Sequence, residues 1–397
     1  MQKSPPSNPS VKLPASIWML GFASLLMDVS SEMIHSLLPL FMVTMLGASA
    51  FTIGIIGGIA EATALSVKVF SGVLSDYLGR RKWLAVAGYS LSALSKPLFA
   101  IATTFNIILV ARVVDRVGKG IRGAPRDALL ADIAPPQLRG AAFGLRQSLD
   151  TLGAFIGPLL AVMLMLLWEN DFRAIFWVAV IPAILAVALL AFGVHEPAHP
   201  HLDKRTNPIQ RKNLQRLTRA YWWVVIIGAT FTLARFSEAF LVLRAMGSGL
   251  PLAFAPVVMI AMNAVYSLTA YPFGKLSDNV SHSKLLVLGL IVLIAADLVL
   301  AYSTHWSVVI LGAALWGLHM GITQGLLVTM VAHAVPADLR GTAYGFFYLM
   351  SSLAMLIASI LAGLIWDQLG ASYTFYAGAT FCILCLALIS IKAHHKI

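Results

Sequence analysis

Long hydrophobic runs separated by short polar segments recur along nearly the whole chain. A run of about 20 apolar residues is long enough to cross the hydrocarbon core of a bilayer as a helix. The first run has no cleavage site of small residues after a short apolar core, so we expect it to be a retained helix rather than a signal peptide. The pattern predicts twelve spans, at 16–43, 51–75, 83–104, 106–131, 139–167, 172–194, 220–246, 251–275, 284–303, 305–334, 341–366 and 371–392.

Composition and charge placement support a membrane protein. Of the 397 residues, 59% are hydrophobic and 11% are charged, and the mean hydropathy is +0.84. The net charge of +11 suggests nucleic acid as a partner, but the basic residues cluster after every second span, as in Arg80–Lys82 and in segment 195–219. Such alternation sets orientation in a bilayer. We therefore expect no nucleic acid, a bacterial-type inner (plasma) membrane location, and both termini in the cytoplasm.

Three short segments recur with an offset of about 200 residues. Gly72–Asp76 returns as Gly274–Asp278, Arg139–Gly144 returns as Arg340–Gly345, and the Ser-Glu pair at Glu32 returns at Glu238. Internal repeats build transporters whose solute site lies near the bilayer midplane, between the repeats. The repeat predicts a cytoplasmic tail (1–15), a six-helix bundle (16–194), a cytoplasmic linker (195–219) and a second six-helix bundle (220–397).

The segment from Gly72 to Lys82, Gly-Val-Leu-Ser-Asp-Tyr-Leu-Gly-Arg-Arg-Lys, resembles the signature loop between helices 2 and 3 of the major facilitator superfamily. The resemblance covers essentially the whole chain and is closest in character to proton-coupled drug and metabolite antiporters. It implies an all-α membrane protein with twelve transmembrane helices in two pseudo-symmetric six-helix bundles, working by alternating access. It also implies a conformational latch made by Gly72, Asp76, Gly79, Arg80 and Arg81.

Ionisable residues stand inside several predicted spans, where a charge costs about 2.5–3.5 kcal/mol by insertion scales unless it faces water or a partner. Asp28 and Glu32 share one helical face with His35. Two close carboxylates cannot both ionise cheaply, so one of them is suited to bind a proton. Arg112 matches the position of the helix-4 arginine that the family resemblance links to proton coupling. We predict a coupling set of Asp28, Glu32, Arg112 and Asp115, with a static network of ion pairs as the alternative.

The fourth span carries Arg112, Arg116, Lys119, Arg122 and Arg126 at helical spacing, which lipid would not tolerate. The stripe therefore faces the bundle or a cavity. Guanidinium groups bind carboxylates and phosphates through two parallel hydrogen bonds, so an anionic or zwitterionic solute is expected. The predicted substrate-binding residues are Glu61, Lys68, Arg116, Lys119, Arg122, Arg146, Arg235, Glu238 and His319. The alternative is internal pairing, of Asp115 with Lys119, Asp150 with Arg146 and Arg235 with Glu238.

These features predict a proton-coupled secondary transporter of a small organic solute, with efflux favoured over uptake. A metal chelate such as a siderophore, moved in or out, and multidrug efflux remain as alternatives. An enzyme is not expected, because no nucleophile–base set and no Gly-rich phosphate loop is present. Cys382 and Cys385 lack the partners of a four-ligand metal site, so neither metal nor cofactor is predicted. The expected partners are the solute, protons and the lipid bilayer, and the expected state is a monomer.

Overall fold

The computed structural model describes residues 13–78, 81–196, 217–277, 279–323, 325–336 and 339–394. In this part of the chain the structure is helical, apart from short connections. The first six helices are α1 (Ala15–Leu46), α2 (Ala50–Leu78), α3 (Arg81–Ala100), α4 (Phe105–Ile133), α5 (Arg139–Leu167) and α6 (Phe172–Gly193). The others are α8 (Arg219–Leu233), α9 (Ala239–Gly247), α10 (Val257–Leu276), α11 (His282–Tyr302), α12 (Trp306–Thr323), α13 (Leu326–Ala334), α14 (Arg340–Leu369) and α15 (Ala371–His394).

Two of the predicted spans are broken helices. The span expected at 220–246 is interrupted at residues 234–238, between α8 and α9. The span expected at 305–334 is interrupted next to Gly325, whose φ of 74° belongs to the left-handed region that favours glycine. Counting α8 with α9 and α12 with α13 as one span each gives twelve spans in the described residues, and the predicted all-α architecture is confirmed.

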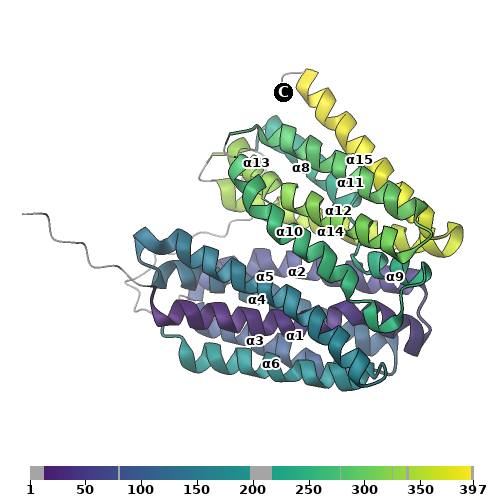
Figure 1. Ribbon diagram of the computed structural model, residues 1–397. Coiled ribbons are helices and arrows are strands. Elements are labelled where there is room, and N and C mark those ends of the chain that lie inside the picture. Colours follow the sequence, from purple (N-terminus) through teal and green to yellow (C-terminus); the bar gives the residue numbers. More distant parts are fainter. Residues whose placement is uncertain are drawn as a thin grey trace, which may run out of the picture.

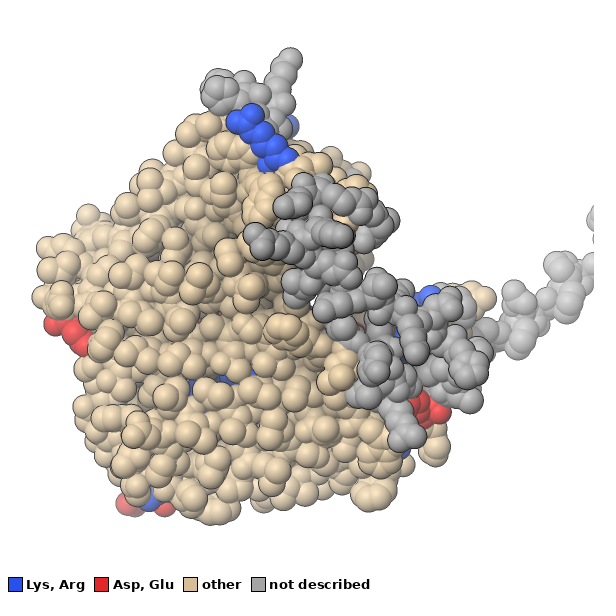
Figure 2. Space-filling model, turned by 180° about the vertical axis from the view of Figure 1, so that it is seen from behind, with Lys and Arg blue, Asp and Glu red and all other residues tan. Residues whose placement is uncertain are grey.

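Nine helical segments of the described chain are long and apolar enough to cross a membrane. The remaining spans are α3 and α4, which carry buried charges, and the broken pair α8–α9. Figure 2 shows a broad face that is almost free of charged side chains, with the coloured atoms mainly at its margins. Such a surface suits lipid tails, and the chain is a multi-pass membrane protein.

The helices form two groups, α1–α6 and α8–α15 (Figure 1). Within the first group, α3 packs on α4, and α1 packs on α5 and α6. Within the second, α12 packs on α10 and α11, and α15 packs on α11. The two groups meet mainly where α2 packs along α14 and α5 packs along α10. The predicted domain boundaries stay a prediction, since residues 1–12 and 197–216 lie outside the described part of the chain.

The contact between α2 and α14 is made by small residues. A Cβ added at Gly58 would lie 3.1 Å from the carbonyl oxygen of Leu356, and one added at Gly363 would lie 2.7 Å from that of Ala50. Small residues let two helix backbones approach closely inside a membrane. This close approach joins the two groups at the end of α2 where that helix begins.

Candidate solute-binding cavity

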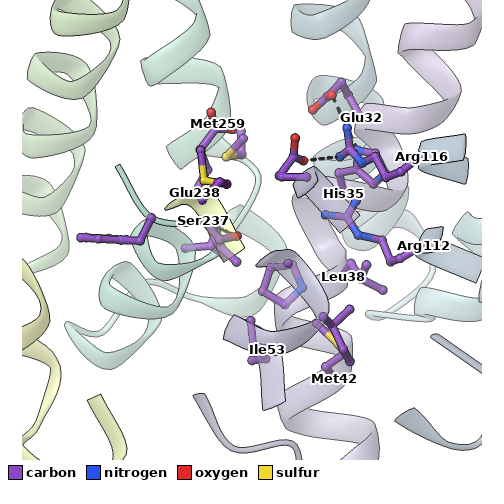
Figure 3. A pocket seen from close by; sticks show the side chains of 18 of the residues that line it. Glu32, His35, Leu38, Met42, Ile53, Arg112, Arg116, Ser237, Glu238 and Met259 are labelled. Carbon is purple, nitrogen blue, oxygen red and sulfur yellow. Dashed lines mark hydrogen bonds and ion pairs between the residues drawn. The ribbon is translucent and has the colours of Figure 1, made fainter. Parts of the chain in front are cut away.

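A cavity of about 250 Å³ lies between the two helix groups. Its wall on one side comes from α1, α2 and α4, and on the other from residues 235–238, α9, α10, α12 and α14. Figure 3 shows Glu32, His35, Arg112 and Arg116 on one side, across from Ser237, Glu238 and Met259. The ionisable residues of the lining are Glu32, His35, Glu61, Arg112, Arg116, Lys119, Arg235 and Glu238.

Arg116 and Arg112 stand one helical turn apart on α4 but differ in their partners. Arg116 forms an ion pair with Glu61 of α2, Nη2 to Oε1 at 3.0 Å, and donates a hydrogen bond to His35 Nδ1 at 3.4 Å. Arg112 is 9% exposed, and no described group accepts a hydrogen bond from its buried Nε or Nη1. Unpaired buried donors cost stability. The guanidinium of Arg112 is therefore available to a ligand.

Behind the cavity wall, charged groups continue into the first helix group. His35 Nε2 lies 3.4 Å from Asp115 Oδ2, and Asp115 Oδ1 lies 2.9 Å from Lys96 Nζ on α3. Lys96 is fully buried and also donates a hydrogen bond to Ser31 Oγ at 2.9 Å. The expected pairing of Asp115 with Lys119 is wrong, because Asp115 turns toward α3 while Lys119 lines the cavity.

Lys96 was missed by sequence reasoning, although a signal was present. It is a cation in the middle of a predicted apolar span, and such residues usually have a buried partner. Its pairing with Asp115 depends on how α3 and α4 lie against each other. The sequence pattern of either helix alone does not contain that register.

Several predicted site residues lie away from the cavity lining. Arg146 pairs with Asp150 at 2.7 Å, as the alternative reading expected. Arg122 is buried on the other side of α4, where it donates a hydrogen bond to Ser92 Oγ and stacks on the ring of Tyr89. The contacts of Arg122 hold α4 against α3, whereas the Arg146–Asp150 pair lies within α5. Neither cation is among the residues that line the cavity.

Asp28 and Lys68 are also outside the lining. Asp28 packs against α5, because a Cβ added at Gly153 of that helix would lie 3.0 Å from the Cβ of Asp28. Lys68 is exposed and lies 5.6 Å from the ring centroid of Tyr348 on α14. Glu32, one turn further along α1, lines the cavity, whereas Asp28 does not.

In the second group, Arg235 and Glu238 line the cavity from the break between α8 and α9. The pairing expected between them is absent from the ion pairs of the described residues, and Arg235 instead lies over the ring of Phe231 at 5.7 Å. Arg235 also lines a neighbouring cavity of about 280 Å³ between α2, α8, α10 and α12–α14. His319 donates a hydrogen bond from Nδ1–H to the carbonyl oxygen of Gly289 at 3.0 Å and does not line either cavity.

The predicted latch falls largely outside the described part of the chain. Gly79 and Arg80 are not described, and Gly72 and Asp76 lie within α2 without described side chains. Arg81 is described: its side chain forms an ion pair with Asp132, and its backbone N–H donates to Glu196 Oε1 at 2.6 Å. The latch role of these residues stays a prediction.

The cavity is suited to bind a small charged solute. Its lining holds four basic residues (Arg112, Arg116, Lys119, Arg235) and three acidic ones (Glu32, Glu61, Glu238). Apolar contacts come from both sides, including Leu38, Met42 and Trp316. Among the described residues no group of three or more His, Cys, Asp or Glu is placed to hold a metal ion.

Comparison with known proteins gives a consistent result. The chain matches the family model described as Major Facilitator Superfamily over residues 20–265 and 245–396. It is 32% identical over 379 residues to an uncharacterized MFS-type transporter of Methanocaldococcus jannaschii, covering 94% of each chain. It is 22% identical over 360 residues to the quinolone resistance protein NorA of Staphylococcus aureus, covering 88% of this chain and 90% of NorA.

A solved structure of a bacterial homolog of the human lysosomal transporter Spinster, in an inward-facing and occupied conformation, has a similar fold. The TM-score is 0.77 at 15% sequence identity, over 95% of this chain and 96% of the other. A likeness at this identity concerns the arrangement of the helices alone. The matched proteins are membrane transporters rather than enzymes.

Proposed function

The chain belongs to the major facilitator superfamily, and from this premise we propose that it is a proton-coupled secondary transporter of a small organic anion or zwitterion. The solute binds between the two helix groups, and the groups then rock so that the cavity opens to the other side of the membrane. Export is favoured over import.

The observation that carries the proposal is the free guanidinium of Arg112. It lies in the wall of a cavity shared by both helix groups, and its buried Nε and Nη1 have no described acceptor. A carboxylate or phosphate group satisfies two such donors at once. Neighbouring Arg116 already holds Glu61, so of these two arginines of α4 it is Arg112 that remains available to the solute.

Glu238 extends this site to zwitterions. It faces the cavity from the second helix group, across from Arg112 and Arg116 (Figure 3), and no described cation lies within ion-pair distance of it. A solute with an anionic group at Arg112 and an ammonium group at Glu238 would contact both helix groups at once. Binding of such a solute would therefore depend on how the two helix groups lie relative to each other.

Proton coupling is supported by the series Glu32, His35, Asp115 and Lys96. His35 Nδ1 lies 3.8 Å from Glu32 Oε1 at the cavity, and His35 Nε2 lies 3.4 Å from Asp115. Histidine can bind a proton on one nitrogen and release one from the other. A proton entering at Glu32 thus changes the charge that Asp115 shares with Lys96, next to the solute site.

The proposed direction of transport and the proposed membrane location rest on two other features. A relative whose name denotes quinolone resistance favours export. Clustering of Arg and Lys after alternate spans favours cytoplasmic termini in a bacterial-type inner membrane. We further propose that the two helix groups are the domains 16–194 and 220–397, that the protein acts as a monomer, and that the segment around Asp76 and Arg81 is the latch.

The test is transport in proteoliposomes with an imposed pH gradient. Ligands are first selected by thermal stabilisation of the purified protein, from panels of carboxylates, phosphates, zwitterions and organic cations. We expect anions or zwitterions to stabilise it, and their flux to follow the gradient. Glu32→Gln should abolish gradient-driven accumulation, whereas Glu169→Gln, at an exposed turn between α5 and α6, should not. Flux of the parent protein that ignores the gradient would refute proton coupling.

A further inference from the structure

Asp297 is a buried carboxyl group that the mechanism above does not use. It lies on α11, five residues before the helix ends at Tyr302, and its side chain is fully buried. Neither Oδ1 nor Oδ2 has a hydrogen-bond partner in the described structure. A carboxylate without water, cation or donor is very unfavourable, so the carboxyl group in this state carries a proton.

The surroundings of Asp297 supply no fixed counter-charge. From α15 the facing titratable group is the Cys382 thiol, itself fully buried. The cation of α9 is Arg244. Its guanidinium nitrogens already donate hydrogen bonds to the carbonyl oxygens of Leu300, Ala301 and Ser303, at N–O distances of 2.7–3.0 Å.

The other ionisable groups near this part of the second helix group are turned elsewhere. His319 of α12 is tied to the carbonyl of Gly289, two turns of α11 before Asp297. Arg235 and Glu238 line the cavity. Of the described charged groups, none forms an ion pair with Asp297, so its proton is held by the burial of the side chain rather than by a partner.

The ring of Phe236 lies between the cavity lining and the surroundings of Asp297. Phe236 lines the cavity, and its ring also contacts Gly378 of α15, against which the Asp297 carboxyl packs: a Cβ added at Gly378 would lie 3.2 Å from Phe236 Cε1 and 2.7 Å from Asp297 Oδ2. Trp316 also lines the cavity and packs beside Phe236, with its ring centroid 5.3 Å from that of Phe236. Its buried Nε1 also lacks an acceptor.

Phe236 stands at the break in the helix that contacts the other helix group. Phe236 belongs to residues 234–238, where the helix between α8 and α9 is broken. Helix α9 in turn contacts α1 and α2 of the other group. In alternating access one helix group rocks or gates against the other around a site that such broken helices form. Separation of α9 from α1 and α2 would therefore shift Phe236 and admit water to Asp297.

An unpaired buried carboxyl group costs free energy and brings no contact in return, so packing does not explain it. We propose that Asp297 is a second proton-binding site, closed off by Phe236 and Trp316 in this state and opened to cavity water when the broken helix moves. On opening, the carboxyl O–H bond breaks, its electron pair stays on the carboxylate, and the proton passes to a water molecule. The proposal rests on the proposed transport cycle, which supplies the opening.

The first test is infrared spectroscopy of the purified protein, which needs no solute. The parent should show a carbonyl band of a protonated carboxylic acid that persists from acidic to alkaline pH and is missing in Asp297→Asn. In Phe236→Ala the same band should disappear at alkaline pH, because water reaches the group. Cys382→Ser should keep the parent band. A spectrum of Asp297→Asn identical to that of the parent, or a Phe236→Ala band as resistant as the parent band, would overturn the proposal.

Transport gives the second readout and separates this proposal from the proposed function. Asn resembles the protonated acid, so Asp297→Asn should fold with a melting temperature no lower than the parent and still exchange solute without a gradient. Accumulation driven by a pH gradient should fall about tenfold or more. Parent-like accumulation refutes the role of Asp297 alone. A parent protein indifferent to the gradient refutes proton coupling, and the infrared band then decides whether Asp297 binds and releases a proton.

Discussion

The Asp367 carboxylate at the end of α14 accepts a hydrogen bond from the backbone N–H of Phe51 at the start of α2, Oδ2 to N at 2.9 Å. Its Oδ1 accepts a second from the N–H of Ala50 at 3.1 Å. The first N–H groups of a helix have no partner within that helix. Here the opposite helix group supplies the cap, so opening the protein at this end must expose those donors.

Replacing Asp367 with Ala should weaken the contact between the end of α14 and the start of α2, which we call the seal. Loss of a helix N-cap costs about 0.5–2 kcal/mol, which shifts the equilibrium between the two access states by about 2- to 30-fold. A thiol reagent applied from the side of the α2 N-terminus should label Met42→Cys, a cavity position, faster in the Asp367→Ala background.

Asp171→Ala is the matched control for that experiment. Asp171 caps α6 by accepting from the N–H groups of Arg173 and Ala174, at 3.0 and 3.1 Å, entirely within the first helix group. Its loss should lower thermal stability without changing the labelling rate at Met42→Cys. Equal labelling rates in the Asp367→Ala and parent backgrounds would show that the cap does not hold the seal.

Gly363→Ala should act on the same contact by sterics. The added Cβ would lie 2.7 Å from both the Ala50 carbonyl oxygen and the Phe51 Cα, so α2 and α14 must separate. The access state sealed at this end should lose population, seen as faster labelling of Met42→Cys. Gly144→Ala has no neighbouring atom within 4 Å and should stabilise α5 by about 1 kcal/mol at most, with unchanged labelling. Unchanged labelling in Gly363→Ala as well would contradict the close-packed seal.

The sequence allowed the helices and part of the site to be predicted, because both follow from one-dimensional spacing. Glu32, Arg112 and Arg116 lie on the cavity, as ionisable groups at helical intervals in apolar spans should. Spacing does not fix contacts between helices. The pairing of Lys96 with Asp115 needs the register of α3 against α4, and Arg122 shares the stripe of Arg112 yet faces α3.

The break after α8 and the cap from Asp367 could not be predicted from the sequence for a related reason. Residues 234–238 contain neither Pro nor Gly, so no local signal marks the end of α8. Asp297 did carry a signal, as an isolated acid in an apolar run, but only the structure places it behind Phe236. Asp367, at the end of a span, has the pattern of an ordinary interfacial residue, and its role as a cap appears only when α14 lies along α2.

Breaking the Lys96–Asp115 pair on one side should be strongly destabilising. Lys96→Met leaves the Asp115 charge buried at 1% exposure, and breaking a buried pair on one side costs about 3–5 kcal/mol. Lys96→Met combined with Asp115→Leu removes both charges and should recover most of the loss. A double-mutant cycle of thermal unfolding in detergent measures the coupling. Additive losses would mean that the two residues do not interact.

Arg112 should be the most demanding position in the cavity for solute binding. Hydrogen bonds to a charged group contribute about 1.5–3 kcal/mol, so Arg112→Ala should raise the Kd for an anionic solute about 10- to 150-fold. Arg112→Lys keeps the charge but loses the planar guanidinium that donates two parallel hydrogen bonds. It should therefore recover only part of that affinity. Titration calorimetry on the purified protein measures both.

Arg173→Lys provides the comparison for that exchange. Arg173 donates from Nη2 to the Ala102 carbonyl at 3.0 Å and is not part of the cavity lining. An Arg-to-Lys change there should leave solute affinity unchanged, which separates loss of the planar guanidinium at the cavity from any general effect of the substitution. An Arg112→Lys protein that binds the solute as tightly as the parent would show that positive charge alone, and not the two-pronged geometry of the guanidinium, selects the anion.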